Sequence, residues 1–183
     1  MNTTVNPLWV VADTSGSMGE AAKLNIMRNL IYYIRESLSL SNYNLSFNKI
    51  FIVTWDEKVK SLKIDSKNDL PAFKVGGKAD VLKLTQYFDQ IPKDGKVKSR
   101  LLILSDWRLE NESKNIFINW AKQQKNNFSI RVVPIEIGMS AAMVNKMSPK
   151  NYFHPQDILK ALTPWVLSSD SEMNLTRIPE SLL

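Results

Sequence analysis

The chain has 183 residues, of which 44% are hydrophobic and 23% charged, and it has no cysteine. This composition is typical of one globular domain and excludes disulfides, thiolate metal sites and cysteine nucleophiles. No segment is apolar for long enough to span a bilayer, and residues 1–4 do not resemble a signal peptide, so we expect a cytoplasmic protein.

The net charge of +6 is concentrated in residues 49–100, which hold twelve Lys and Arg against seven Asp and Glu. Such an excess could serve a nucleic acid or an acidic partner. The lysines are spread without stacking aromatics between them, and no nucleic-acid motif accompanies them. A solvated face is the simpler interpretation, and we do not expect nucleic acid to bind.

The first element is an apolar run that ends at a carboxylate. Residues 8–12 predict a strand buried on both faces, and Asp13, Ser15 and Ser17 follow it at alternate positions. Their side chains could offer three hard oxygens to one Mg²⁺, Mn²⁺ or Ca²⁺. The alternative is that they only cap the next helix.

The middle of the chain alternates between helical and strand patterns. We expect a helix over residues 19–40, a buried strand over 49–55 and a hairpin return over 58–62. A loop over 65–77 closes with Gly76 and Gly77, and a helix over 80–91 follows.

The second half begins by repeating the opening pattern, because residues 100–105 form an apolar strand followed by Asp106. Next come a helix over 112–124 and a strand over 128–137, whose Pro134 indicates an edge or a bulge. We expect a short helix over 140–147 and a last one over 156–167. Residues 1–167 then form the domain, and 168–183 a polar, poorly ordered tail.

Strands that alternate with amphipathic helices predict an α/β fold. We expect three layers, αβα, with a doubly wound and mainly parallel sheet and one antiparallel edge strand. No Gly-rich dinucleotide motif or phosphate-binding loop is present, so nucleotide binding is unsupported.

Three motifs together carry a family resemblance: Asp-Thr-Ser-Gly-Ser-Met at 13–18, Gly-Gly at 76–77 and Leu-Ile-Leu-Ser-Asp at 102–106. Over residues 7–167 the chain resembles a von Willebrand factor A domain, and its form is similar to the tellurite-resistance type. The resemblance implies a metal-ion-dependent adhesion site that holds Mg²⁺ or Mn²⁺. The residues that it carries over as ligands are Asp13, Ser15, Ser17 and Asp106.

The chain departs from this family at two positions. After the two glycines the family has a threonine ligand, whereas here Lys78, Ala79 and Asp80 follow, and Trp107 stands where the family usually has glycine. A lysine ammonium about 6 Å from a divalent ion repels it by roughly 5 kcal/mol at an effective dielectric constant of about 20. Lys78 could point inward and replace the metal, or point outward and leave Asp80 or water as a ligand.

The family implies a non-enzymatic protein-interaction module, in which a partner's carboxylate fills an open position on the metal. It also suggests an adaptor in a bacterial stress-response complex with kinase and phosphatase proteins. We expect the surrounding rim to comprise Met18, Gly19, Gly76, Gly77 and an exposed Trp107.

Two other classes of function stay open at this point. One is a Mg²⁺-dependent phosphohydrolase using Asp13 and Asp106, for which the sequence shows no catalytic base beside the serines. The single histidine, His154, is more typical of a structural residue. The other is an RNA-binding protein of the same fold, with steeply salt-dependent binding as its signature.

Overall fold

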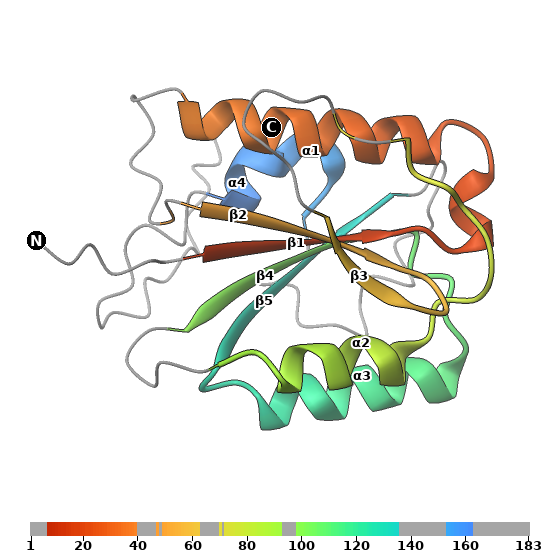
Figure 1. Ribbon diagram of the computed structural model, residues 1–183, viewed down its shortest axis with the longest axis vertical. Coiled ribbons are helices and arrows are strands. Elements are labelled where there is room, and N and C mark those ends of the chain that lie inside the picture. The colour runs from red at the N-terminus through yellow and green to blue at the C-terminus, as the bar shows by residue number, and fades with distance from the viewer. Residues whose placement is uncertain are drawn as a thin grey trace, which may run out of the picture.

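The computed structural model describes residues 7–39, 47, 49–62, 70, 72–92, 98–135 and 153–162. Its centre is a five-stranded sheet in the order β3-β2-β1-β4-β5 (Figure 1). The β2–β3 pair is antiparallel and the other pairs are parallel. The strands are β1 (Pro7–Asp13), β2 (Lys49–Trp55), β3 (Val59–Leu62), β4 (Ser99–Ser105) and β5 (Phe128–Pro134).

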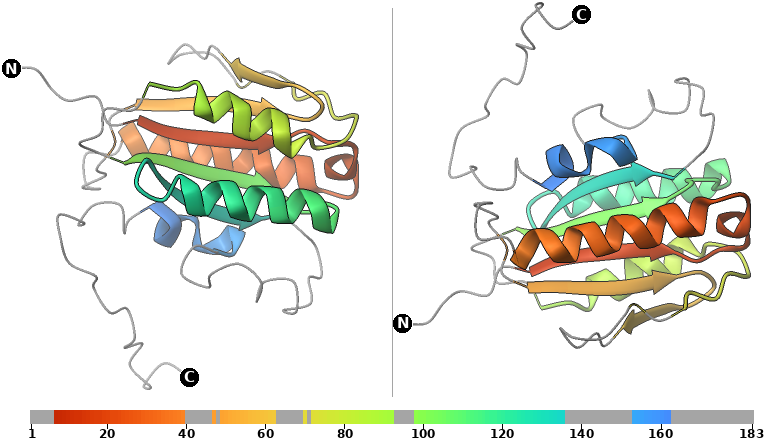
Figure 2. Two further views of the ribbon diagram at one scale, coloured as in Figure 1. Left: turned by 90° about the horizontal axis from the view of Figure 1, so that it is seen from below. Right: turned by 90° about the horizontal axis from the view of Figure 1, so that it is seen from above.

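Helices cover both faces of this sheet. In Figure 2, α1 and α4 lie over one face and α2 and α3 over the other. Their bounds are α1 (Lys23–Ser39), α2 (Val81–Asp89), α3 (Asn111–Gln123) and α4 (Ile158–Leu162), with 3₁₀ turns η1 (Gly16–Gly19) and η4 (Pro155–Asp157). The predicted three-layer α/β fold with an antiparallel edge strand is therefore confirmed.

Two apolar clusters, one on each side of the sheet, hold the layers together. Val10 and Ala12 face α1, while Val11 faces α2 and α3, and all three side chains are inaccessible to solvent. Burial on both faces explains why β1 reads as a continuous apolar run rather than an alternating one.

The register of the strands places the polar residues at one edge. Ala12 pairs with Leu104 across β1 and β4, so Asp13 and Ser105 come next to each other where the two strands end. Because both strands run in the same direction, the loops that follow them leave the same edge, as in other open α/β sheets.

The largest difference from the predicted elements is the start of the first helix. We expected it from residue 19, but α1 begins at Lys23, since residues 16–19 form a 3₁₀ turn and Ala21 has a φ of 50°. A positive φ is incompatible with a right-handed helix. Pro134 is the last residue of the edge strand β5, as its missing N–H requires.

The described residues include no helix with the length and apolar character needed to cross a membrane. The predicted helix over 140–147, the end of the predicted last helix and the tail over 168–183 lie outside the described residues.

Candidate functional site

The four predicted ligand residues come together where β1 and β4 end. The Ser15 and Ser17 Oγ atoms are 3.4 Å apart, and Ser17 Oγ donates to Asp106 Oδ1 at 3.1 Å. Asp13 Oδ1 accepts a hydrogen bond from the Ser15 backbone N–H at 2.9 Å, which fixes the turn. The spacing in the sequence therefore predicted a real cluster of oxygens.

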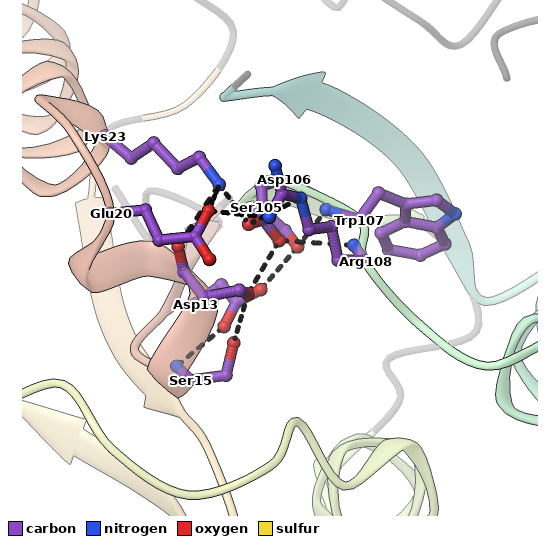
Figure 3. A network of polar contacts seen from close by, with 9 residues as sticks. Asp13, Ser15, Glu20, Lys23, Ser105, Asp106, Trp107 and Arg108 are labelled. Atoms are coloured by element: carbon purple, nitrogen blue, oxygen red, sulfur yellow. Dashed lines mark hydrogen bonds and ion pairs between the residues drawn. The ribbon is translucent and has the colours of Figure 1, made fainter. Parts of the chain in front are cut away.

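Asp13 is nearly inaccessible, with 1% of its surface exposed. Burial raises its pKa above the ordinary value; hydrogen bonds from Ser105 and Ser15 oppose this rise, and the nearby charge of Asp106 adds to it. Ser105 Oγ donates to Asp13 Oδ2 at 2.5 Å and accepts from the Trp107 N–H at 2.9 Å (Figure 3). Sequence reasoning gave Ser105 no role, because only the strand register shows that it lies beside Asp13.

Asp106 is equally buried, and its partner is a residue that the sequence analysis did not single out. Lys23 Nζ donates to Asp106 Oδ2 at 2.8 Å and to Glu20 Oε2 at 3.1 Å (Figure 3). Burial lowers the pKa of Lys23, but hydrogen bonds to these two carboxylates outweigh it, so the pKa lies above its ordinary value. The sequence does contain an indication that Lys23 is buried. It lies four residues before Met27 and therefore on the apolar stripe of α1.

The Gly-Gly loop is fastened to the turn after β1 by two backbone hydrogen bonds. The Gly16 N–H donates to Gly77 O at 3.0 Å, and the Gly76 N–H donates to Thr14 O at 2.9 Å. Gly77 has a φ of +67°, a conformation that favours glycine. These contacts bring the loop over residues 76–79 to the site.

Of the two orientations considered for Lys78, the structure shows the outward one. Its ammonium lies 2.7 Å from Glu110 Oε1, with both side chains about two-thirds exposed, at 67% and 66%. Asp80 accepts a hydrogen bond from the Lys83 N–H as the N-cap of α2 and does not line the pocket described below. The cations that pair with the buried Asp106 are Lys23, at 2.8 Å, and Arg108, at 3.8 Å.

Two rim predictions are wrong. Met18 is fully buried, because η1 turns its side chain into the core beneath α1. Trp107 is only 7% exposed, and its ring meets Phe117 edge to face, with ring centroids 5.1 Å apart. Its φ of 56° is left-handed, which explains why glycine suits this position in the family. Gly19 and Gly77 are exposed as expected, and Gly76 partly so.

A pocket of about 230 Å³ opens above the oxygen cluster. Asp13, Ser15 and Ser17 line it together with the charged side chains of Lys78, Arg108 and Glu110. Arg108 also bonds Glu20, at 2.6 Å, so each basic side chain at the pocket is paired with an acidic one.

The oxygen atoms fit a hard divalent cation. Neighbouring ligand oxygens around Mg²⁺ lie about 3 Å apart, because each is about 2.1 Å from the metal. The spacings of 3.4 Å between Ser15 and Ser17 and 3.1 Å between Ser17 and Asp106 are close to this value. The described residues contain no group of three or more His, Cys, Asp or Glu side chains that could hold a metal, so hydroxyls would have to complete the site.

No family model matches the chain, and no curated protein matches it in sequence. Solved structures do match. The manganese-loaded TRAP protein of Plasmodium vivax has a TM-score of 0.63 at 16% identity, over 88% of this chain and 73% of that one. A von Willebrand factor type A structure from Catenulispora acidiphila has a TM-score of 0.53 at 12% identity, over 88% of this chain and 42% of that one.

A third match is proximal thread matrix protein 1 from the mussel byssus, described with a zinc-occupied MIDAS motif. Its TM-score is 0.56 at 10% identity, over 87% of this chain and 45% of that one. The chain thus spans less than half the length of the byssus and Catenulispora proteins. These matches identify the fold as that of von Willebrand factor A domains, as the sequence resemblance implied.

Proposed function

We propose that the chain is a non-enzymatic protein-interaction module that binds a carboxylate of a partner protein through a divalent cation. Asp13, Ser15, Ser17 and Asp106 would hold the cation. The observation that carries the proposal is that Asp13, Ser15 and Ser17 line one pocket, and that Ser17 Oγ is hydrogen-bonded both to Ser15 Oγ and to the buried Asp106. The manganese and zinc described for two structures of the same fold are consistent with it.

The donor set suits this task. A divalent cation bound here would supply a Lewis-acidic position for an oxygen of the partner. Ser15 and Ser17 contribute neutral hydroxyls, so the formal negative charge near that position comes from the two aspartates alone. The pocket of about 230 Å³ is smaller than a usual small-molecule site of about 300 to 1,000 Å³ and suits a single acidic side chain.

The charged rim would assist recognition. Lys78 and Arg108 reach the pocket from two different loops, and each already bonds an acidic side chain of the chain itself. An incoming carboxylate can exchange with these exposed pairs at little loss, since such pairs contribute about 0 to 1 kcal/mol. His154, by contrast, does not line the pocket, so it adds no catalytic group there.

The wider role extends from the sequence resemblance to the tellurite-resistance type. We propose a cytoplasmic adaptor in a bacterial stress-response complex, with kinase or phosphatase proteins among its partners. Affinity capture with wild-type chain and with Asp13→Ala, each with manganese or with chelator, tests this role. A partner retained equally by both forms would not bind through the pocket.

Calorimetric titration of Mg²⁺ and Mn²⁺ into the chain tests the metal site directly. We expect binding by the wild type and none by Asp13→Ala. The matched control is Asp157→Ala, which removes a carboxylate that does not line the pocket. Absence of binding in the wild type at millimolar metal, in acetate as well as in chloride, would refute the metal bridge. Equal binding by Asp13→Ala would show that the metal binds outside this pocket.

A further inference from the structure

Lys23 is a cation that the candidate site already contains. Its side chain is 3% exposed, and its ammonium lies 2.8 Å from Asp106 Oδ2. The other two partners are Glu20 Oε2 at 3.1 Å and the Ser17 carbonyl oxygen at 3.2 Å. Three acceptors use all three N–H donors of the ammonium, so the group is fully satisfied where it lies.

This ammonium shares a carboxylate with the predicted metal site. Asp106 Oδ1 accepts from Ser17 Oγ, whose residue lines the pocket. Asp106 Oδ2 accepts from Lys23 (Figure 3). A metal ion bound to Oδ1 at about 2.1 Å would lie within about 7 Å of Lys23 Nζ. Two cations so close, with little water between them, compete for the charge of the same aspartate.

The formal charges of the site show what this competition does. Asp13, Asp106 and Glu20 carry −3, and Lys23 and Arg108, which both pair with Asp106 and Glu20, reduce this to −1. A divalent cation would bring the site to +1, and one carboxylate from a partner would return it to zero. Without Lys23 the cation alone would neutralise the site, and a partner's carboxylate would add an uncompensated charge.

We propose that Lys23 is a built-in counter-cation that weakens metal binding by the free module and makes it depend on the partner's carboxylate. The proposal rests on the proposed function for the identity of the site. It adds a residue of α1 that is outside the ligand set and gives that residue a regulatory role. The coupling acts in both directions, since binding free energies at two sites are linked reciprocally.

The test is a Mn²⁺ titration of the wild type, Lys23→Met and the control Lys160→Met, in chloride and again in acetate as the carboxylate probe at equal ionic strength. We expect Lys23→Met to bind Mn²⁺ at least tenfold more tightly than the wild type in chloride. Lys160→Met should change the affinity less than threefold, because Lys160 is exposed, pairs with Asp157 and does not line the pocket. Acetate should strengthen Mn²⁺ binding by the wild type and not by Lys23→Met, after correction for free Mn²⁺.

Thermal unfolding gives a second readout in case Lys23→Met folds poorly. Removing Lys23 leaves the buried Asp106 with only the longer ion pair to Arg108, at 3.8 Å, so the variant should melt at a lower temperature than the wild type in chelator. Mn²⁺ should then raise its melting temperature more than that of the wild type. Lys23→Arg, which keeps the charge, should behave as the wild type in both measurements.

The outcomes separate this inference from the proposed function. Binding by Lys23→Met in chloride, with binding by the wild type only in acetate, supports both the counter-cation and the metal bridge. Absence of wild-type binding in acetate as well as in chloride refutes a metal bridge in the natural chain. Equal binding by both supports the metal site and overturns the role of Lys23. Binding by neither overturns both.

Discussion

Trp107 combines a buried ring with a backbone conformation that disfavours side chains, and the two effects can be separated. Its φ is 56°, and its ring packs against Phe117 in the cluster beneath α2 and α3. We compare Trp107→Ala with Trp107→Gly, both of which remove the ring. Only the glycine variant also relieves the left-handed strain, because glycine has no Cβ.

Trp120 is the matched control. It is 6% exposed against 7% for Trp107, and it also contacts Phe117, but it lies within α3. Either truncation should reduce the free energy of unfolding by about 3 to 5 kcal/mol. At Trp120, the free energy of unfolding of the glycine variant should be about 1 kcal/mol lower than that of the alanine variant, as in any helix interior. At Trp107, the free energy of unfolding of the glycine variant should be about 1 kcal/mol higher than that of the alanine variant.

At each position, the stability of the alanine variant is subtracted from that of the glycine variant. We expect the result at Trp107 to exceed the result at Trp120 by about 2 kcal/mol. Urea denaturation followed by circular dichroism resolves this difference, since at an m-value of about 2 kcal/mol/M it corresponds to about 1 M in the midpoint. Sucrose in every sample keeps the truncated variants folded at low urea. If glycine is worse than alanine by the same amount at both positions, the left-handed conformation does not strain the chain.

Two further predictions concern the same sheet edge. Burial raises the folded-state pKa of Asp13, so the unfolded state loses its proton first and stability falls as pH rises from about 3.8 toward the raised pKa. Asp13→Asn does not titrate, so its stability relative to wild type in chelator should increase from pH 3.5 to 7; a constant difference would contradict the assignment. Gly77→Ala should lower the free energy of unfolding by about 1 to 2 kcal/mol, because Gly77 has a φ of +67°. The control is Gly76→Ala, where the added Cβ meets open space. It should change the free energy of unfolding by less than about 0.5 kcal/mol in the same urea assay.

The fold was predictable because each layer leaves a periodic trace in the sequence. Strands buried on both faces give continuous apolar runs, and helices packed on one face give stripes at spacings of three and four. The start of α1 was not predictable in this way. Residues 19–22 carry no apolar signal that separates a helix from the 3₁₀ turn and the positive φ at Ala21.

The candidate site was predictable to the extent that it follows from strand ends. Asp13 and Asp106 each terminate an apolar run, and parallel pairing alone brings them together. The roles of Ser105 and Lys23 depend on register and on where a long side chain ends, which no spacing rule specifies. The sequence analysis therefore considered only Lys78, the nearest unusual residue in the motif, as a cation near the predicted metal ligands, and did not consider Lys23 on α1.

Burial explains why Lys23 and Lys78 differ so much in effect. Lys78 and Glu110 form a pair in water, where the loss of one partner leaves the other well solvated, so the pair can exchange with an incoming carboxylate. Lys23 and Asp106 form a pair almost out of contact with water, where the loss of one partner leaves a buried charge with much less compensation. Without Lys23, Asp106 would keep only the longer ion pair to Arg108, at 3.8 Å, so a metal ion bound beside Asp106 would restore the missing positive charge.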